Sequence, residues 1–232
     1  MEQLNSYADE RLIAGCVYCG CATESRDHVP SRVLLDEPYP ENLPVVPACD
    51  ACNRSYSLDE QYFACLIECA RVGSVDGVQR PKIARILREN LALADRISRA
   101  RSVTDQNTIS FSVETARARN VVLKLARGHL AYEASETLRR VPSHFMIAPL
   151  LTLESSSRQH FETIPGSQIW PEVGSRAMQR LTIAGNDVTD EGWIEVQPEQ
   201  YRYFVVAEGD VLVRLVVSEY LACEVIWYND HS

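Results

Sequence analysis

The segments Cys16-Val17-Tyr18-Cys19-Gly20 and Cys49-Asp50-Ala51-Cys52-Asn53 are the most informative part of the sequence for the fold, with 29 residues between Cys19 and Cys49. Two Cys-x-x-Cys pairs supply four thiolates, which satisfy tetrahedral zinc in a closed, structural site. Gly20 suits a knuckle whose backbone turns around the metal. Cys21 is a competing ligand, but the paired spacing favours Cys19. The alternative is two unrelated cysteine pairs. The interval exceeds the roughly 15–20 residues of a simple zinc ribbon, so the chain between the pairs must contain structure of its own.

That interval contains Arg26-Asp27-His28-Val29-Pro30 and a second extended run, Asn42-Leu43-Pro44-Val45-Val46-Pro47, which enters Cys49. Neighbouring side chains of an extended chain point to opposite faces. Asp27 can therefore hold a metal ion while His28 presents an imidazole to a water molecule. Simpler interpretations stay open: His28 as a surface histidine, Asn42 as a turn residue, and Asn53 as a residue common at helix starts.

In type and order, these residues resemble the zinc-stabilised HNH endonucleases over about residues 14–70. The resemblance implies a ββα-metal core, in which a two-stranded hairpin and a helix clasp one divalent cation. It implies the following roles: Cys16, Cys19, Cys49 and Cys52 as structural zinc ligands, His28 as general base, Asp27 and Asn53 as ligands of the catalytic cation, and Asn42 as the residue that orients the loop and the histidine. Where many members carry a lysine or histidine shortly after the last motif position, this chain has Arg54-Ser55-Tyr56-Ser57, and Arg54 becomes the candidate phosphate contact.

The chemistry fits these residue types. A histidine near its ordinary pKa of about 6.5 can deprotonate water at neutral pH. A hard cation held by oxygen atoms stabilises the phosphorane and the leaving oxygen, and oxygen ligands favour Mg²⁺ or Mn²⁺ over zinc. We therefore expect two metals with different roles: zinc for folding and Mg²⁺ or Mn²⁺ for hydrolysis.

The chain of 232 residues has a net charge of -9, which by itself argues against a polyanionic partner. The charge is unevenly distributed. Residues 80–140 contain 13 basic and 6 acidic residues, a net charge of +7, whereas residues 1–79 and 141–232 each have a net charge of -8. A local basic face can bind phosphate because fields are screened over about 8–10 Å. The candidate nucleic-acid contacts in this segment are Arg85, Arg88, Arg96 and Arg99.

Periodicity predicts the remaining elements. Residues 82–101 read as one amphipathic helix, and residues 114–136 as a second, with Arg117, Lys124 and Arg127 opposite its apolar stripe. Residues 201–206 and 211–217 read as strands of a hairpin. Residues 141–190 are ambiguous. The glycine-containing segment 72–77 predicts a boundary between a nuclease domain, residues 1–75, and a helical, then β-rich accessory domain, residues 76–232. The predicted class is α+β.

Several single residues have structural interpretations. Ser57 and Glu60 form a capping box, so we expect the helix after the second cysteine pair to restart there. Asp59 and Glu60 are alternative metal carboxylates, although capping accounts for Glu60. Cys65, Cys69 and Cys223 read as buried thiols, and His129 as a core histidine.

The expected function is a metal-dependent HNH endonuclease that hydrolyses phosphodiester bonds, with DNA favoured as substrate. One alternative is a catalytically silent, zinc-stabilised module that binds nucleic acid or protein. Another is a nuclease subunit of a defence or mobile-element system. A homodimer or a partner protein is left open. The chain has neither an apolar stretch near the roughly 18 residues of a membrane span nor a basic, apolar start typical of a secretory signal. We therefore expect a cytoplasmic protein.

Overall fold

The computed structural model describes residues 13–41, 43–164 and 192–229. Its main sheet is antiparallel with strand order β5-β9-β8-β7-β6, and two separate hairpins pair β1 with β2 and β3 with β4. The strands are β1 (Ser25–His28), β2 (Val45–Ala48), β3 (Arg101–Val103), β4 (Ile109–Phe111), β5 (His144–Pro149), β6 (Ile194–Gln197), β7 (Tyr201–Glu208), β8 (Asp210–Val217) and β9 (Leu221–Trp227). The α-helices are α1 (Asp50–Val72), α2 (Pro81–Glu89), α3 (Leu91–Ala100), α4 (Thr115–Ala134) and α5 (Ser155–Glu162), with 3-10 turns η2 (Arg32–Leu34) and η3 (Leu150–Thr152).

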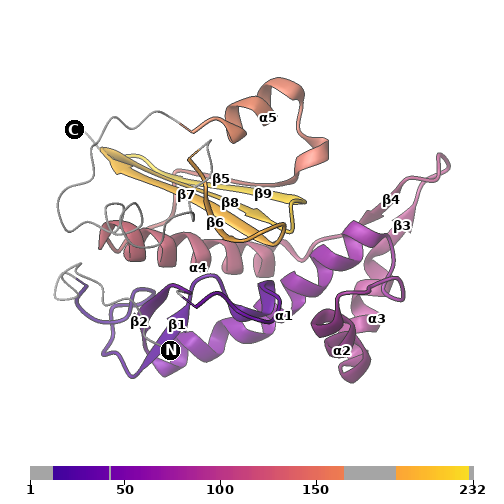
Figure 1. Cartoon of the computed structure of the whole chain (residues 1–232), viewed down its shortest axis with the longest axis horizontal. Helices are drawn as coiled ribbons and strands as arrows, with labels where there is room; N and C mark the ends of the chain where they lie inside the picture. Colours follow the sequence, from indigo (N-terminus) through magenta and orange to yellow (C-terminus); the bar gives the residue numbers. More distant parts are fainter. Residues whose placement is uncertain (1–12, 42, 165–191, 230–232) are drawn as a thin grey trace.

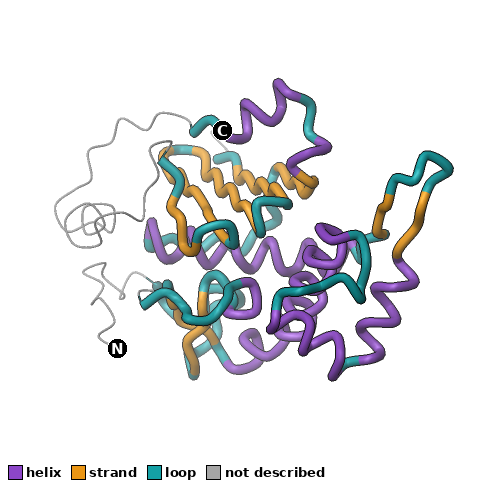
Figure 2. The backbone as a smooth tube through the Cα atoms, turned by 45° about the vertical axis from the view of Figure 1, so that its right-hand side comes forward, coloured by secondary structure: helices purple, strands orange, loops and turns teal. Residues whose placement is uncertain are grey.

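Helix α4 forms the central layer of the molecule. It lies between the five-stranded sheet and α1, while α5 covers the opposite face of the sheet (Figure 1). The β1–β2 hairpin packs beside the start of α1, and α2 and α3 lie toward its other end (Figure 1). Figure 2 shows the β3–β4 hairpin projecting from the body. The apolar stripe of α4, centred on Val121, Val122 and Leu125, is fully buried, which explains why this helix is interior.

His129 attaches α4 to the sheet. It is fully buried, its Nε2 atom lies 2.8 Å from the Tyr201 hydroxyl, and its ring stacks on Tyr203 with centroids 3.7 Å apart. The prediction of a core histidine is therefore confirmed. Cys65, Cys69 and Cys223 are buried free thiols, as predicted.

One hydrophobic cluster contains buried side chains from both sides of the boundary predicted at residue 75, including Cys65, Leu125 and Tyr203. Segment 72–77 is the connection between α1, which ends at Val72, and α2. Gly73 caps α1 with a left-handed backbone, φ 82°, and its N–H donates to the Cys69 carbonyl. The two-domain division stays a prediction, and the hydrophobic packing is continuous across it.

Three local predictions are corrected by the structure. The single helix expected over residues 82–101 is two helices, because Asn90 leaves helical geometry and its side-chain oxygen caps α3 by accepting from the Leu93 N–H. Helix α1 runs uninterrupted from Asp50 to Val72, so Ser57 and Glu60 do not restart it. Lys124, expected on an exposed basic face, is 1% exposed.

The hairpin predicted near the C-terminal end is confirmed: β7 and β8 pair in register from Tyr201–Val217 to Glu208–Asp210, and Gly209 makes the turn with φ 80°. The ambiguous segment contains β5, η3 and α5, and residues 165–191 lie outside the described part of the chain. Within the described ranges, no helix combines the length and apolar character that a bilayer span needs.

Candidate functional site

The two cysteine pairs meet in one cluster. The sulfur atoms of Cys16, Cys19, Cys49 and Cys52 lie within 4.8 Å of one another, and those of Cys19 and Cys49 are 3.6 Å apart. A tetrahedron with zinc–sulfur bonds of about 2.3 Å has sulfur–sulfur edges of about 3.8 Å. This set of four thiols could hold a structural zinc ion. Cys21 is exposed and stands outside the cluster, as the paired spacing predicts.

Backbone turns bring these sulfurs together. Gly20 adopts φ 85°, and its N–H donates to the Cys16 carbonyl at 2.8 Å. Burial raises the pKa of Cys16, but N–H groups of Cys49, Cys19 and Tyr18 donate to its sulfur and bring that pKa to about 7. Cys16 is therefore the thiol that ionises most readily to the thiolate a metal requires, whereas burial and the neighbouring cysteines raise the pKa of Cys52. The Cys49 sulfur also accepts from the Cys52 N–H at 3.4 Å and so caps α1.

The predicted hairpin and helix lie directly beside this cluster. Strands β1 and β2 are antiparallel, with Asp27 opposite Val46 and His28 opposite Val45. Asn53, in the first turn of α1, donates through Nδ2 to Ser25 Oγ at 3.3 Å and to the Arg26 carbonyl at 3.4 Å. A ββα arrangement with a cysteine cluster at its base is thus present. Asn42 lies outside the described residues.

Asp27 is buried, and one of its carboxylate oxygens, Oδ2, has two partners. Its Oδ2 accepts from the Tyr18 hydroxyl at 2.7 Å and lies 2.8 Å from Lys124 Nζ. The Lys124 ammonium also contacts Glu60 Oε1 and, at 2.8 Å, Ser31 Oγ. Glu60 therefore pairs with α4, and Lys124 faces the hairpin instead of solvent. Burial and the Asp27 charge raise the pKa of Tyr18 well above its usual value, so the phenol keeps the proton that it donates.

His28 lies beside this ion cluster but is only half-buried. Burial lowers its pKa below the usual value, and Arg32 and Lys124 act in the same direction, while Asp27 opposes them. The imidazole is therefore neutral at neutral pH. Its Nδ1 atom is buried and has no hydrogen-bond partner among the described residues. A neutral imidazole can accept a proton from water. Because Nδ1 is buried, the water would have to reach the ring at Nε2.

In the part of the chain that the structure describes, the four cysteines are the only group of three or more His, Cys, Asp or Glu side chains placed to hold a metal ion, and the oxygen atoms near Asp27 do not form a second one. Two carboxylates, Asp27 and Glu60, face one ammonium, so one negative charge remains in the cluster. The Asn53 amide directs its NH₂ group to β1, which frees its carbonyl oxygen to act as a ligand. A cation at Asp27 would nevertheless share that carboxylate with Lys124.

The predicted nucleic-acid contacts are dispersed. Arg54, Arg85, Arg88, Arg96 and Arg99 are all exposed. Arg54 donates to the Asp50 carbonyl, Arg99 pairs with Asp95, and Arg96 lies 3.7 Å from Glu114. In Figure 1, α3 lies away from the β1–β2 hairpin, so Arg96 and Arg99 are not brought beside His28. The basic residues of α4 are also used internally: Arg117 pairs with Asp59, and Arg127 donates to the carbonyls of Arg139 and Arg140.

A different basic surface lies around Tyr39, and one of its residues, Arg32, is close enough to His28 to lower the pKa of that imidazole. Burial and Glu37 raise the pKa of Tyr39, and Arg32 and Arg85 partly oppose them, so both guanidinium groups lie near this ring. Arg32 stands 5.3 Å from the ring centroid. Lys82 donates to the Arg32 and Leu35 carbonyls and to the Tyr39 hydroxyl, which fixes the loop after β1 against α2. Arg32 follows the Asp-His pair by only four residues, and this closeness was the available signal for it in the sequence.

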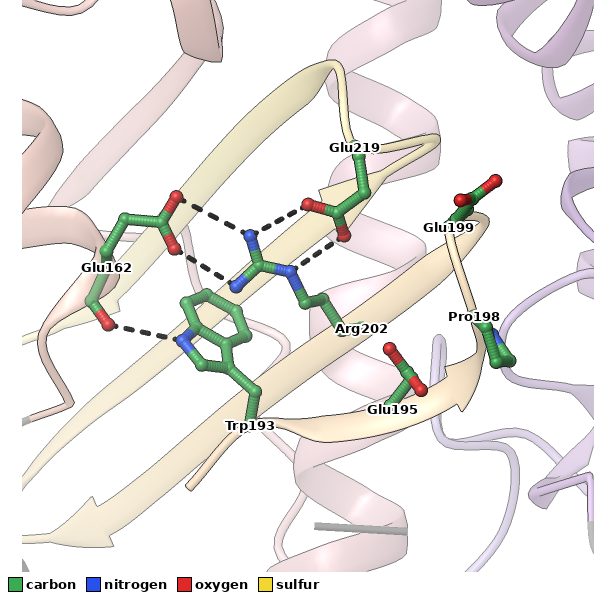
Figure 3. Close-up of a pocket in the computed structure, with 7 residues that line it drawn as sticks. All are labelled: Glu162, Trp193, Glu195, Pro198, Glu199, Arg202 and Glu219. Atoms are coloured by element: carbon green, nitrogen blue, oxygen red, sulfur yellow. Dashed lines mark hydrogen bonds and ion pairs between the residues drawn. The ribbon is translucent and has the colours of Figure 1, made fainter. Parts of the chain in front are cut away.

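A cavity of about 500 Å³ lies on the other side of the sheet (Figure 3). Its polar lining is mainly acidic: Glu162, Glu195, Glu199 and Glu219. Arg202 is pinned between Glu162 and Glu219 and lies 4.5 Å from the Trp193 ring. Its one guanidinium is already neutralised, so this cavity is unsuited to phosphate.

Comparison of the chain with known proteins finds no matching family model, no similar curated protein and no similar solved structure. The site must therefore be judged by its own geometry and chemistry.

Proposed function

We propose that this protein is a zinc-stabilised HNH-type endonuclease that hydrolyses phosphodiester bonds, with DNA as its favoured substrate. The observation that carries the proposal is the pairing of Asp27 with His28 on the hairpin. The first side chain is buried beside Lys124, and the second is a half-buried imidazole whose pKa is lowered and whose buried Nδ1 has no hydrogen-bond partner among the described residues. A carboxylate and a lowered-pKa imidazole on neighbouring residues are the pair of groups that metal-assisted hydrolysis uses.

In this mechanism His28 removes a proton from the attacking water. Its lowered pKa keeps the base form populated at neutral pH. Asp27 and Asn53 would hold the divalent cation, Mg²⁺ or Mn²⁺, which when bound neutralises charge on the phosphoryl group and the leaving oxygen. Arg32 and Arg85, beside Tyr39, form the basic surface on which the phosphate backbone approaches His28.

The experiment compares wild type with His28→Ala on supercoiled plasmid, linear duplex and single-stranded DNA, each with Mg²⁺, Mn²⁺ or chelator. We expect wild type to cut and His28→Ala to lose activity while keeping its zinc content and circular dichroism. His160→Ala is the matched control, because this exposed histidine lies on α5 across the sheet. Cleavage that survives His28→Ala would refute the assigned base.

One observation favours a second function, a zinc-stabilised binding module without turnover. Asp27 already has Lys124 and Tyr18 as partners, so its burial does not by itself require a cation. This module would retain DNA or protein and show no cleavage under any metal condition. A role inside a larger defence or mobile-element assembly, self-association and a cytoplasmic location stay predictions.

A further inference from the structure

Lys124 is the most unusual buried group near the candidate site. It lies in the middle of α4 between apolar positions and is 1% exposed. An ammonium group has three N–H donors, and all three are used: Asp27 Oδ2 and Ser31 Oγ lie at 2.8 Å, and Glu60 Oε1 is the third acceptor. A buried charge is costly unless it is paired in this way, and an apolar side chain of similar volume would often serve stability as well.

The partners of Lys124 come from separate elements of the ββα unit. Asp27 belongs to β1, Ser31 to the loop after it, and Glu60 to α1. Tyr18, from the cysteine knuckle, adds a hydrogen bond to the same Asp27 oxygen at 2.7 Å. The Lys124 ammonium therefore bridges the Asp27 and Glu60 carboxylates, as a bound cation would.

We propose that the Lys124 ammonium competes with the divalent cation for the Asp27 carboxylate and thereby sets how tightly the protein binds that ion. The inference rests on the proposed function, which supplies the reason for a cation at Asp27. A resident positive charge repels an incoming ion at close range, and it also occupies an oxygen that the ion would use. Removing the ammonium should expose two buried carboxylates and create a stronger cation site.

The test measures Mn²⁺ binding to the zinc-loaded full chain by calorimetry and by electron paramagnetic resonance, without substrate. Lys124→Met should bind a single Mn²⁺ roughly tenfold or more tightly than wild type. Without Mn²⁺ it should unfold at a lower temperature than wild type, and Mn²⁺ should restore much of that loss. Lys124→Gln, which keeps polar contacts, serves as a second variant.

Two controls separate this site from other sites. Arg119→Met removes a positive charge from the same helix near Phe145, away from Asp27, and should leave Mn²⁺ affinity unchanged. The double variant Asp27→Asn/Lys124→Met should lose the gained affinity. Unchanged Mn²⁺ affinity in both Lys124 variants would overturn the proposal, as would failure of both to fold even with Mn²⁺ present.

These outcomes are independent of nuclease activity. Tighter Mn²⁺ binding in Lys124→Met together with no cleavage by wild type would refute the hydrolase and leave the competition supported. Cleavage that depends on His28 together with unchanged Mn²⁺ affinity would refute the competition and leave the hydrolase supported.

Discussion

Gly128→Ala tests the packing that brings α4 onto the hairpin. Gly128 lies one helical turn after Lys124, and a Cβ atom there would lie 2.6 Å from Val29 Cγ2 and 3.0 Å from Cγ1. Favourable carbon–carbon contacts are about 3.5–4.0 Å. Val29, which directly follows His28, is fully buried, so its side chain has no open space into which it could move away from the added methyl group.

The size of the effect follows from two opposing terms. Alanine is favoured over glycine inside a helix by about 1 kcal/mol. Overpacking in a dense core costs about 1–3 kcal/mol. We expect Gly128→Ala to lower the free energy of unfolding in wild type. In a Val29→Ala background both clashing methyl groups are gone and the Cβ atom of residue 29 remains at 3.3 Å, so the same change should raise the free energy of unfolding by up to about 1 kcal/mol. The coupling between the two sites should equal the clash, about 1–3 kcal/mol.

The assay is equilibrium urea unfolding of four zinc-loaded proteins: wild type, each single variant and the double variant. A coupling below about 0.5 kcal/mol would mean that the two sites act independently. That result would refute the close approach of α4 to β1, and with it the contact between Lys124 and Asp27.

Three further predictions concern other parts of the molecule. Removing the metal with a chelator, or replacing Cys49 with Ser, should abolish zinc binding and the thermal unfolding transition of the hairpin region. The reason is that the Cys49 sulfur is both a proposed zinc ligand and the N-cap of α1. A thermal transition unchanged by the chelator would contradict the zinc site. The double variant Arg32→Gln/Arg85→Gln should weaken DNA binding. It should also reduce the slope of log affinity against log salt concentration by about 2, because each phosphate contact contributes about 0.9. The control Arg99→Gln should have little effect, because Arg99 pairs with Asp95, and equal effects of both variants would place the interface elsewhere. Arg214→Met should lower the free energy of unfolding by about 3–5 kcal/mol, measured in urea, because it removes the donors to Glu224 Oε2 and to the carbonyls of His160, Phe161 and Thr163. Glu224→Gln, which retains an acceptor, should cost less, and the reverse order would contradict this account.

Features that depend on local spacing could be predicted from the amino-acid sequence. Two Cys-x-x-Cys pairs specify a cluster of four sulfurs because each short turn can present both of its thiols to one ion. The β7–β8 hairpin follows from a glycine-containing turn between two short runs rich in apolar residues, and the α4 helix from its 3.6-residue apolar period. Asp27 and His28 could likewise be assigned to opposite faces of one strand.

The surroundings of those residues could not be predicted from the sequence, because they depend on how the folded elements pack against one another. Lys124 reads as one more residue of a basic helix face, yet α4 is covered on two sides, by the sheet and by α1, so a wider arc of the helix is buried than its stripe predicts. Glu60 reads as a cap, yet it pairs with that lysine 64 positions further along the chain. The same applies to the basic surface near His28, which forms from η2, Tyr39 and α2. Such contacts depend on which helix faces meet across the core, and a one-dimensional period carries no information on that.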